Sequence, residues 1–430
     1  MTSADTHRTI DAVWRIESPR IIAGIARIVR DLGLAEELAQ DALVAALEQW
    51  PASGIPDNPG AWLTAAAKHR AIDHLRRNKL LERKHEELRY QHEGHQKPPD
   101  YESAIDDEFG DDLLRLVFTA CHPVLSSEAR VALTLRLLGG LTTAEIARAY
   151  LVPEATIAQR IVRAKRTLSE NQVPFEVPRG EELASRLTSV LEVIYLIFNE
   201  GYTATAGSDW TRPALCEDAL RLGRILAELI PKDPEVHGIV ALMEIQVSRS
   251  RARVSASGEP IMILDQKRAL WDQLLIRRGL AALERAQQLG GSPGPYVLQA
   301  AIAACHARAR VAEETDWERI AALYAALARL LPSPIVDLNR AVAVAMAFGP
   351  QAGIEIVDQL LREPSLQSYH LLPSVRGDLL TKLGRFDEAR AEFERAASLT
   401  RNARERKLLL ERAEQALAAS CAPTNSTPDP

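Results

Sequence analysis

The chain has 430 residues and a formal net charge of −6, which excludes a uniformly basic nucleic-acid-binding protein but leaves room for a local basic patch. Apolar residues make up 47% of the chain and aromatic residues only 5%, while helix-forming residues dominate. Because runs with the two-residue alternation of β-strands are hard to find, we predict an all-α protein of several domains.

Two helices of different character are predicted near the N-terminus. Residues 34–50 form an amphipathic pattern with acidic residues early, and we expect this helix to stop at Pro51. After a turn-rich loop at residues 52–60, residues 61–79 form a second helix whose C-terminal half is basic. The helix dipole favours cations at that end, but their density also makes a surface for phosphates. The cations are Lys68, Arg70, Arg76, Arg77 and Lys79.

A polar segment follows the basic helix. Residues 80–112 are polar, and residues 100–112 carry acidic side chains with no Lys or Arg. Such a composition favours a linker over a packed core. We therefore predict a first domain at residues 8–79, a polar and acidic linker at 80–110, and a second domain at 111–172.

The second domain contains the pattern of a helix-turn-helix at residues 141–168. Thr142 or Thr143 can cap the first helix, with Glu145 near the reciprocal position of a capping box. Pro153 suits the first turn of the second helix, where its missing N–H costs nothing. The turn between the two helices has the three or four residues that this motif requires.

The second helix of this motif has two distinct faces. At about 100° per residue, four apolar residues fall within a wedge of about 60°, which we predict to be buried, and Lys165 falls beside this stripe. On the opposite polar face, Gln and Arg can make bidentate contacts to base edges in a major groove. The alternative is a solvated face on an ordinary helical hairpin. The buried stripe comprises Ile157, Ile161, Ala164 and Leu168, and the polar face comprises Thr156, Gln159, Arg160, Arg163 and Arg166.

Residues 180–418 are predicted to form a long helical extension with an internal repeat. The segment that begins at Trp317 matches the one that begins at Phe386, at an offset of 69 residues. This offset is close to two tetratricopeptide periods of about 34 residues, so we predict tetratricopeptide-like helix pairs with a face for a protein partner. The alternative is a helical bundle that only packs. We expect residues 247–260 to form an exposed loop and residues 419–430 a disordered tail.

Several motifs carry a resemblance to a known family. The segments AEELAQDA at residues 35–42, AWL at 61–63 and AIDHLRR at 71–77 resemble region 2 of the extracytoplasmic-function (ECF) sigma factors of bacterial RNA polymerase. The helix-turn-helix at 141–168 resembles region 4 of the same family. The segment FNEGY at 198–202 is similar to a subgroup whose members carry a long helical C-terminal extension.

This resemblance implies a protein that directs core RNA polymerase to specific promoters. The helix of region 2 is then expected to dock on the β′ clamp helices through Glu37, Gln40 and Asp41. The basic helix, with the five cations named above, is expected to hold the separated −10 strand. Region 4 is expected to contact the β flap and to read the −35 element with its polar face. The partners implied are thus core polymerase and promoter DNA.

Asn199, Glu200 and Tyr202 lie close enough in the sequence to supply acid–base groups, but no catalytic motif accompanies them. We therefore expect no enzyme, and we predict that these residues lie at a junction through which the extension controls transcription in cis. The alternative function is a one-component helix-turn-helix regulator with a repeat domain that senses a ligand or partner. That alternative does not explain the resemblance to region 2.

The cysteines favour neither a disulfide framework nor a zinc site, because they stand about ninety or more residues apart. They are Cys121, Cys216, Cys305 and Cys421. No signal peptide is recognisable, and no apolar run approaches the about 18 residues of a membrane span. We therefore expect a cytoplasmic protein with no metal, no cofactor and no membrane contact.

Overall fold

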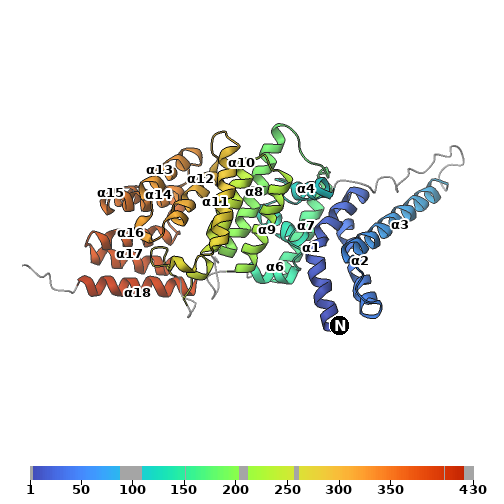
Figure 1. Ribbon diagram of the computed structural model, residues 1–430, viewed down its shortest axis with the longest axis horizontal. Helices are drawn as coiled ribbons and strands as arrows, with labels where there is room; N and C mark the ends of the chain where they lie inside the picture. Colours follow the sequence, from blue (N-terminus) through green and yellow to red (C-terminus); the bar gives the residue numbers. More distant parts are fainter. Residues whose placement is uncertain are drawn as a thin grey trace, which may run out of the picture. The chain divides into compact units, whose positions relative to one another are not determined.

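The computed structural model is α-helical in the part of the chain that it describes, with 3-10 helices in some of the connections (Figure 1). It describes residues 3–87, 109–150, 152–202, 212–255, 261–400 and 402–420. Within these ranges there is no β-sheet, so the predicted all-α class is confirmed. The chain divides into two compact units, residues 1–196 and 197–430, and the boundary falls inside helix α8 (Glu181–Tyr202).

The described part of the first unit consists, before α8, of α1 (Ser3–Val29), α2 (Leu32–Ser53), α3 (Pro59–Glu87), α4 (Phe109–Ala120), α5 (Ser127–Leu137), α6 (Thr143–Tyr150) and α7 (Glu154–Glu170). Helix α1 packs against α2, α3 and α4, while α7 packs against α5 and α6. The core of the first three helices includes Ile10, Ile25, Leu38, Trp50 and Leu63, which are all buried.

Helix α2 begins and ends at clear local signals. The side chain of Asp31 accepts a hydrogen bond of 2.7 Å from the backbone N–H of Leu34 and so caps the first turn. The helix continues through Pro51 to Ser53, so the predicted stop at Pro51 is wrong. Gly54 has a φ of 87° and donates its N–H to the Trp50 carbonyl (3.0 Å), which closes the last turn.

The segment predicted as a linker is partly helical. Helix α3 runs on to Glu87, beyond the expected end at residue 79, and α4 begins at Phe109. The remainder of the predicted linker, residues 88–108, lies outside the described residues.

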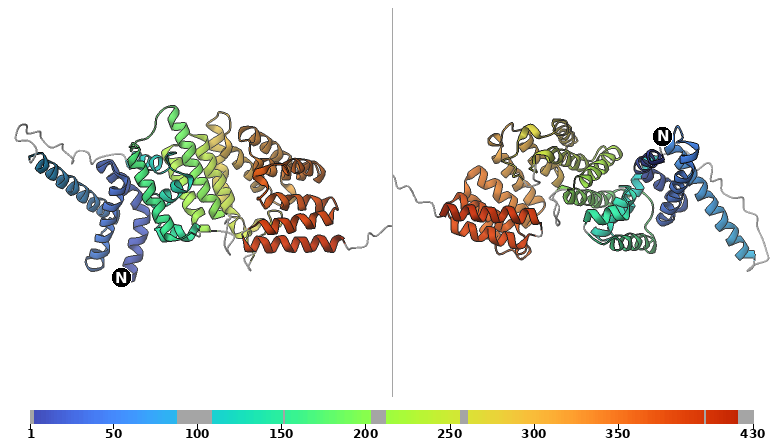
Figure 2. Two further views of the ribbon diagram at one scale, coloured as in Figure 1. Left: turned by 180° about the vertical axis from the view of Figure 1, so that it is seen from behind. Right: turned by 90° about the horizontal axis from the view of Figure 1, so that it is seen from below.

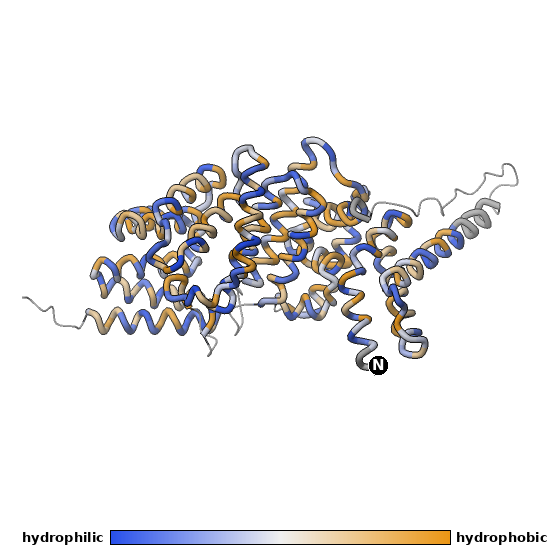
Figure 3. Tube along the Cα trace, in the orientation of Figure 1, coloured by the Kyte–Doolittle hydropathy of each residue, from blue (hydrophilic) through white to orange (hydrophobic). Residues whose placement is uncertain are grey.

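The second unit continues with α9 (Pro213–Leu229), α10 (Pro234–Ser248), α11 (Gln273–Gln288), α12 (Pro295–Arg308), α13 (Trp317–Leu330), α14 (Pro334–Phe348), α15 (Pro350–Leu360), α16 (Leu371–Lys382), α17 (Phe386–Leu399) and α18 (Ala403–Ser420). From α12 to α18 each helix packs against the next one in the chain (Figure 2). Apolar and polar residues alternate along these helices, as expected for amphipathic helices that bury one face (Figure 3).

The last six helices form three successive pairs with the predicted repeat. The first helices of the pairs begin at Trp317, Pro350 and Phe386, which are 33 and 36 residues apart. Gly353 of α15 permits close packing against α14 of the preceding pair, because a Cβ there would lie 2.5 Å from the Cβ of Ala345. Gly384, with a φ of 74°, ends the helix before Phe386. The repeat is therefore tetratricopeptide-like.

Residues 419–430 were predicted to form a tail. From position 421 onward this segment lies outside the described residues.

The expectation of an exposed loop at residues 247–260 is wrong for its first half. Helix α10 continues to Ser248, a 3-10 turn covers Ser250–Ala252, and both Ala252 and Arg253 are buried. Residues 256–260 lie outside the described part of the chain. In the ranges that the structure describes, no helix has the length and apolarity needed to cross a bilayer, and no cluster of side chains suits a metal ion.

Candidate nucleic-acid interface

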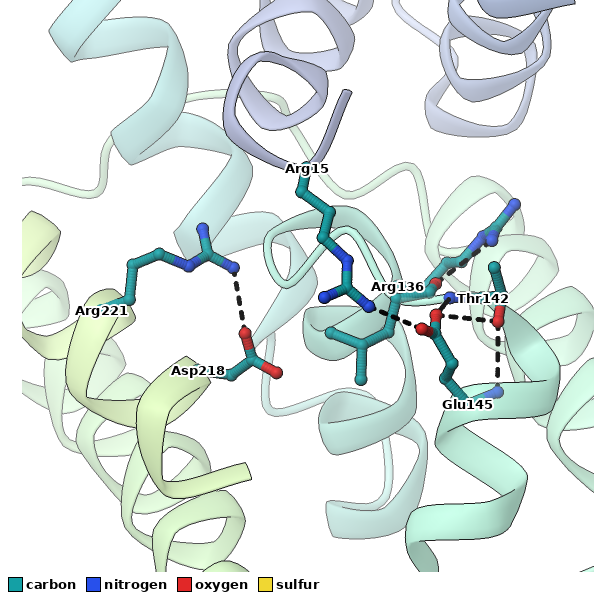
Figure 4. Close-up of polar contacts among 7 residues, drawn as sticks. Arg15, Arg136, Thr142, Glu145, Asp218 and Arg221 are labelled. Carbon is teal, nitrogen blue, oxygen red and sulfur yellow. Dashed lines mark hydrogen bonds and ion pairs between the residues drawn. The ribbon is translucent and has the colours of Figure 1, made fainter. Parts of the chain in front are cut away.

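Helices α6 and α7 form the predicted helix-turn-helix, and Thr142 is its N-cap. The backbone N–H of Thr142 donates to the Glu145 carboxylate (2.8 Å), and the N–H of Glu145 donates to the Thr142 hydroxyl (3.1 Å). Figure 4 shows this reciprocal capping box and Arg15 of α1 reaching the same carboxylate at 2.5 Å. Burial raises the pKa of Glu145, but the bonds from Thr142 and the charge of Arg15 outweigh it and lower the pKa overall.

The buried face of α7 is the predicted one. Ile157, Ile161, Ala164 and Leu168 are all buried, so their phase on the helix is confirmed. On the opposite face Gln159, Arg163 and Arg166 are exposed, whereas Thr156 and Arg160 are half-buried. The guanidinium of Arg166 also pairs with Glu170 one turn later (2.6 Å).

One exposed side chain of α7 was missed by the sequence analysis. Val162 is 65% exposed although it lies within an otherwise polar stretch of surface. An exposed valine on a helix is ordinary, but next to arginines it offers an apolar contact of the kind that a thymine methyl accepts. The helical period could have predicted its exposure, because Val162 precedes the exposed Arg163 and lies about 100° from the buried Ile161.

The basic end of α3 presents its last arginines to solvent. Arg76 and Arg77 are exposed and make no ion pair with another described residue. Lys68 and Arg70 are half-buried, and Arg70 donates to the carbonyl of Ala66 on its own helix (3.2 Å). For Lys79 the structure describes the helical backbone only.

The three residues predicted to contact polymerase do not share one environment. Glu37 and Asp41 are exposed on α2, and Val44 beside them is also exposed. Gln40 is half-buried and donates its amide to the carboxylate of Glu36 (2.7 Å). Glu37 and Asp41 therefore face solvent, while Gln40 belongs to a network inside the unit.

The centre of this network is Glu36, whose side chain is only 6% exposed. Its carboxylate accepts a hydrogen bond from Arg136 of α5 (2.6 Å) and forms an ion pair with Lys165 of α7. Arg136 also donates to the carbonyl of Leu141, directly before the cap of α6 (3.2 Å). One carboxylate of α2 therefore holds both α5 and α7.

Burial raises the pKa of the Glu36 carboxyl, but the charges of Lys165 and Arg136 outweigh it, so the pKa lies below its ordinary value. The carboxylate is thus ionised at neutral pH and compensates two cations at once. The sequence carried one signal for this contact, namely a glutamate within the apolar stripe of Ala35, Leu38 and Ala39. Its partners lie 100 and more residues away and had no local signal.

A second carboxylate joins α1 to α4. Asp112 is buried and forms ion pairs with Arg27 (3.0 Å) and Arg115 (2.6 Å). Together with the Arg15–Glu145 pair, this contact ties the N-terminal helices to the helix-turn-helix side of the first unit. The two predicted DNA-binding surfaces therefore belong to one packed body.

The beginning of α8 completes the core under the helix-turn-helix. Ser189 donates to the carbonyl of Cys121 (2.8 Å), and Arg186 donates to the carbonyl of Phe118 (2.9 Å). Arg130 of α5 forms an ion pair with Glu192 (3.1 Å). Burial raises the pKa of Cys121 to about 11, so this thiol is a packing group rather than a reactive one.

The residues predicted at the junction lie at the end of α8, in the second unit. Asn199 is exposed, and Glu200 forms an ion pair with Arg212. The hydroxyl of Tyr202 accepts a hydrogen bond from Arg249 (2.5 Å). Arginines therefore engage both ionisable groups, and the three residues do not assemble an acid–base site among themselves.

Three family models match separate parts of the chain. The family model described as "Sigma-70 region 2" matches residues 14–80, and the model described as "Sigma-70, region 4" matches residues 115–168. A family of unknown function (DUF6596) matches residues 186–287.

The chain is also similar to several known proteins. It is 43% identical to an uncharacterized protein of Rhizobium meliloti over 92% of this chain and 93% of that protein. It is 26% identical to the probable ECF RNA polymerase sigma factor SigI of Mycobacterium tuberculosis, over 40% of this chain and 58% of that protein. It is 32% identical to the ECF RNA polymerase sigma factor SigK of Mycobacterium ulcerans, over 35% of this chain and 78% of that protein.

The buried ion pairs lead to a prediction about stability. Replacing Glu36 with Gln leaves Arg136 and Lys165 without a negative partner, and we expect the first unit to lose about 3 kcal/mol. This value is at the low end for a broken buried ion pair, because both cations are partly exposed. Hydrogen exchange of the full chain should rise in α2, α5 and α7. Glu37→Gln, the same change at the exposed neighbour, is the control, and equal exchange in both variants contradicts the prediction.

The same carboxylate predicts a pH dependence. Because the pKa of Glu36 is lower in the folded state, its contribution is complete above the unfolded value of about 4.3 and is lost as the pH falls through the folded pKa. We expect the free energy of unfolding of the first unit to decrease below about pH 4.5, and to decrease less in Glu36→Gln. Urea unfolding across this pH range measures how the free energy of unfolding changes with pH in the wild type and in Glu36→Gln. Equal changes in the two proteins contradict the assignment of this pH dependence to Glu36.

Proposed function

The chain belongs to the extracytoplasmic-function family of RNA polymerase sigma factors, in a form with a C-terminal helical extension, and from this we propose how its residues divide the work of promoter recognition. Sigma factors of this family bind core RNA polymerase and promoter DNA, and this chain has both of the regions that do so.

Helix α7 reads the −35 element with its polar face. The observation that carries this assignment is the phase of the helix, because the apolar stripe is buried and Gln159, Arg163 and Arg166 point outward. Gln and Arg are the side chains that make bidentate contacts to adenine and guanine in a major groove. Thr156 and Arg160, at the edge of this face, complete the contact surface.

The basic end of α3 holds the separated −10 strand. Arg76 and Arg77 are exposed and carry charge that no described carboxylate neutralises. Lys68, Arg70 and Lys79 belong to the same basic stretch. Phosphate contacts of this kind position a strand without reading its sequence, so base recognition at −10 requires other groups of the first unit.

The exposed face of α2 docks on core polymerase. Glu37 and Asp41 lie one turn apart on this face, with the apolar Val44 beside them. Two carboxylates next to an exposed valine suit a partner helix that offers cations and an apolar groove, which we assign to the β′ clamp helices. Gln40 supports this face from within through its hydrogen bond to Glu36. The β flap is the proposed partner of region 4.

The packed first unit is a resting form. The −10 and −35 elements are centred about 25 base pairs apart, which is roughly 85 Å at about 3.4 Å per base pair. The side chain of Glu36 links α2 of region 2 directly to α5 and α7 of region 4. Regions held this close together do not reach both promoter elements at once. We therefore propose that α2 separates from α5 and α7 when the protein binds polymerase and promoter, with loss of the Glu36 ion pairs.

The extension controls this step in cis. The boundary between the units falls inside α8, whose first part supplies Arg186 and Ser189 to the core under the helix-turn-helix. A change at the end of α8, where Glu200 and Tyr202 bind arginines, can therefore be transmitted through this helix. A repressor with a sensing domain is the weaker candidate, because it leaves the match to region 2 without a role.

The assignment of α7 is tested in transcription by added core polymerase. On templates with single −35 substitutions at fixed salt, Arg160→Ala and Arg163→Ala should each lose about 1–3 kcal/mol of discrimination at one base pair. Arg20→Ala, an exposed arginine of α1, is the matched control and should preserve discrimination. If both α7 variants discriminate like the control, the polar face does not read the promoter. If the chain supports no transcription by core polymerase, the sigma assignment itself fails.

Control in cis is tested by deletion of the extension. A chain that ends at Leu196 retains Arg186, Ser189 and Glu192, whereas one that ends near residue 178 removes these partners of Phe118, Cys121 and Arg130. We expect the 1–196 chain to differ at least about threefold from the full chain in promoter-specific transcription, equivalent to roughly 0.7 kcal/mol. Equal transcription by both chains, at equal folded concentration, contradicts control by the extension.

A further inference from the structure

Three arginines and two aromatic rings form a cluster in the second unit, around the end of α10. The guanidinium of Arg253 lies 3.4 Å from the centroid of the Tyr202 ring. That of Arg249 lies 5.8 Å from the Tyr202 ring and 5.6 Å from the Trp271 ring. Arg268 lies 4.5 Å from the Trp271 ring. The cluster thus concentrates positive charge against aromatic faces.

Two of these arginines have only neutral hydrogen-bond acceptors among the described residues. Arg249 donates to the hydroxyl of Tyr202 and the side-chain amide of Gln246. Arg268 donates to the carbonyl of His306 and, at 3.3 Å, to the hydroxyl of Thr315. The carboxylates of Glu313 and Glu314 act on Arg268 from beyond ion-pair distance.

Other half-buried arginines of the same unit have carboxylate partners. Arg212 pairs with Glu200, and Arg412 pairs with Asp378 at 2.6 Å. Arg376 binds two carboxylates, including that of Asp358 at 2.9 Å. Half-buried cations in this unit are therefore normally neutralised, so Arg249 and Arg268 stand apart and call for a counter-ion.

Two polar atoms next to this charge have no hydrogen-bond partner in the part of the chain that the structure describes. They are the indole N–H of Trp271, a residue that is 3% exposed, and the Nε of Arg268. Burial and the charges of Arg249 and Arg268 lower the pKa of His306 to about 4, so this ring is neutral at pH 7. Burial is the larger cause of this low pKa, and the charges of the two arginines add to it.

We propose that Arg249 and Arg268, between the rings of Tyr202 and Trp271, form a binding site for the phosphate or carboxylate group of a small molecule. A planar guanidinium binds either group through two parallel hydrogen bonds, and the Trp271 N–H and the Arg268 Nε supply further donors. Tyr202, Arg249, Arg268 and His306 are each half-buried, so the cluster is open to solvent. The binding site stands independently of the transcription mechanism, while its use as a sensor rests on the proposed function.

Calorimetric titration of the full chain with inorganic phosphate, at constant ionic strength set by chloride, tests the site. We expect saturable binding that is at least about tenfold weaker in Arg249→Gln and in Arg268→Gln, since each variant loses charge-assisted hydrogen bonds to the anion. Trp271→Phe keeps an aromatic ring at this position, removes the N–H donor and should also weaken binding. Arg277→Gln, an exposed arginine of α11 without an ion pair to another described residue, is the control and should bind like the wild type.

A second titration with acetate identifies the group. Saturable binding of phosphate alone assigns a phosphate-bearing ligand, and binding of acetate alone assigns a carboxylate. If circular dichroism shows that an arginine variant does not fold, anion binding by Trp271→Phe is compared with that of the wild type instead. The proposal is overturned if neither anion saturates a site on the wild-type chain, or if all four variants bind as the wild type does. Because no transcription is measured, these outcomes are independent of those that test the proposed function.

Discussion

The carboxylate of Glu36 is the contact on which the arrangement of the first unit depends. A buried charge costs several kcal/mol unless cations compensate it, so α5 and α7 are held where Arg136 and Lys165 can both reach this side chain. With Glu36 turned inward, Glu37 and Asp41 face solvent, because successive residues of a helix are about 100° apart. The packing of α7 and the exposed surface of α2 therefore follow from the same side chain.

The distribution of compensated and uncompensated cations separates packing from binding. Inside the first unit, Arg136 and Lys165 share one carboxylate, and Arg27 has Asp112. On the proposed DNA faces, Arg76 and Arg163 have no carboxylate partner in the described chain, which is how a protein of net charge −6 can still present local positive surfaces. In the arginine–aromatic cluster of the second unit, Arg249 and Arg268 likewise have no carboxylate partner among the described residues, although they are half-buried.

The sequence predicted best what depends on neighbours within a helix or turn. The cap at Thr142 and the buried stripe from Ile157 to Leu168 need only the geometry of one turn and the 3.6-residue period. It could not predict the Glu36 ion pairs, because Arg136 and Lys165 are distant in the chain and tertiary packing alone brings them together. The segment after Ser248 was misjudged for a related reason, since Arg253 is buried against the ring of Tyr202 and the half-buried Arg249 lies near the ring of Trp271, both contributed by other segments.

An ion-pair contact of modest strength suits the proposed mechanism, in which the first unit opens when the protein binds polymerase and promoter. A free-energy difference of about 3 kcal/mol between the packed and open forms leaves the open form at roughly 1 part in 150. Polymerase and promoter bind only the open form in the proposed mechanism, so their apparent affinity falls by that fraction. A ligand in the second unit then needs only about 1.4 kcal/mol of differential affinity for the two forms to change the open fraction tenfold. In this mechanism, control by the extension requires only a small bias on the equilibrium in which α2 separates from α5 and α7.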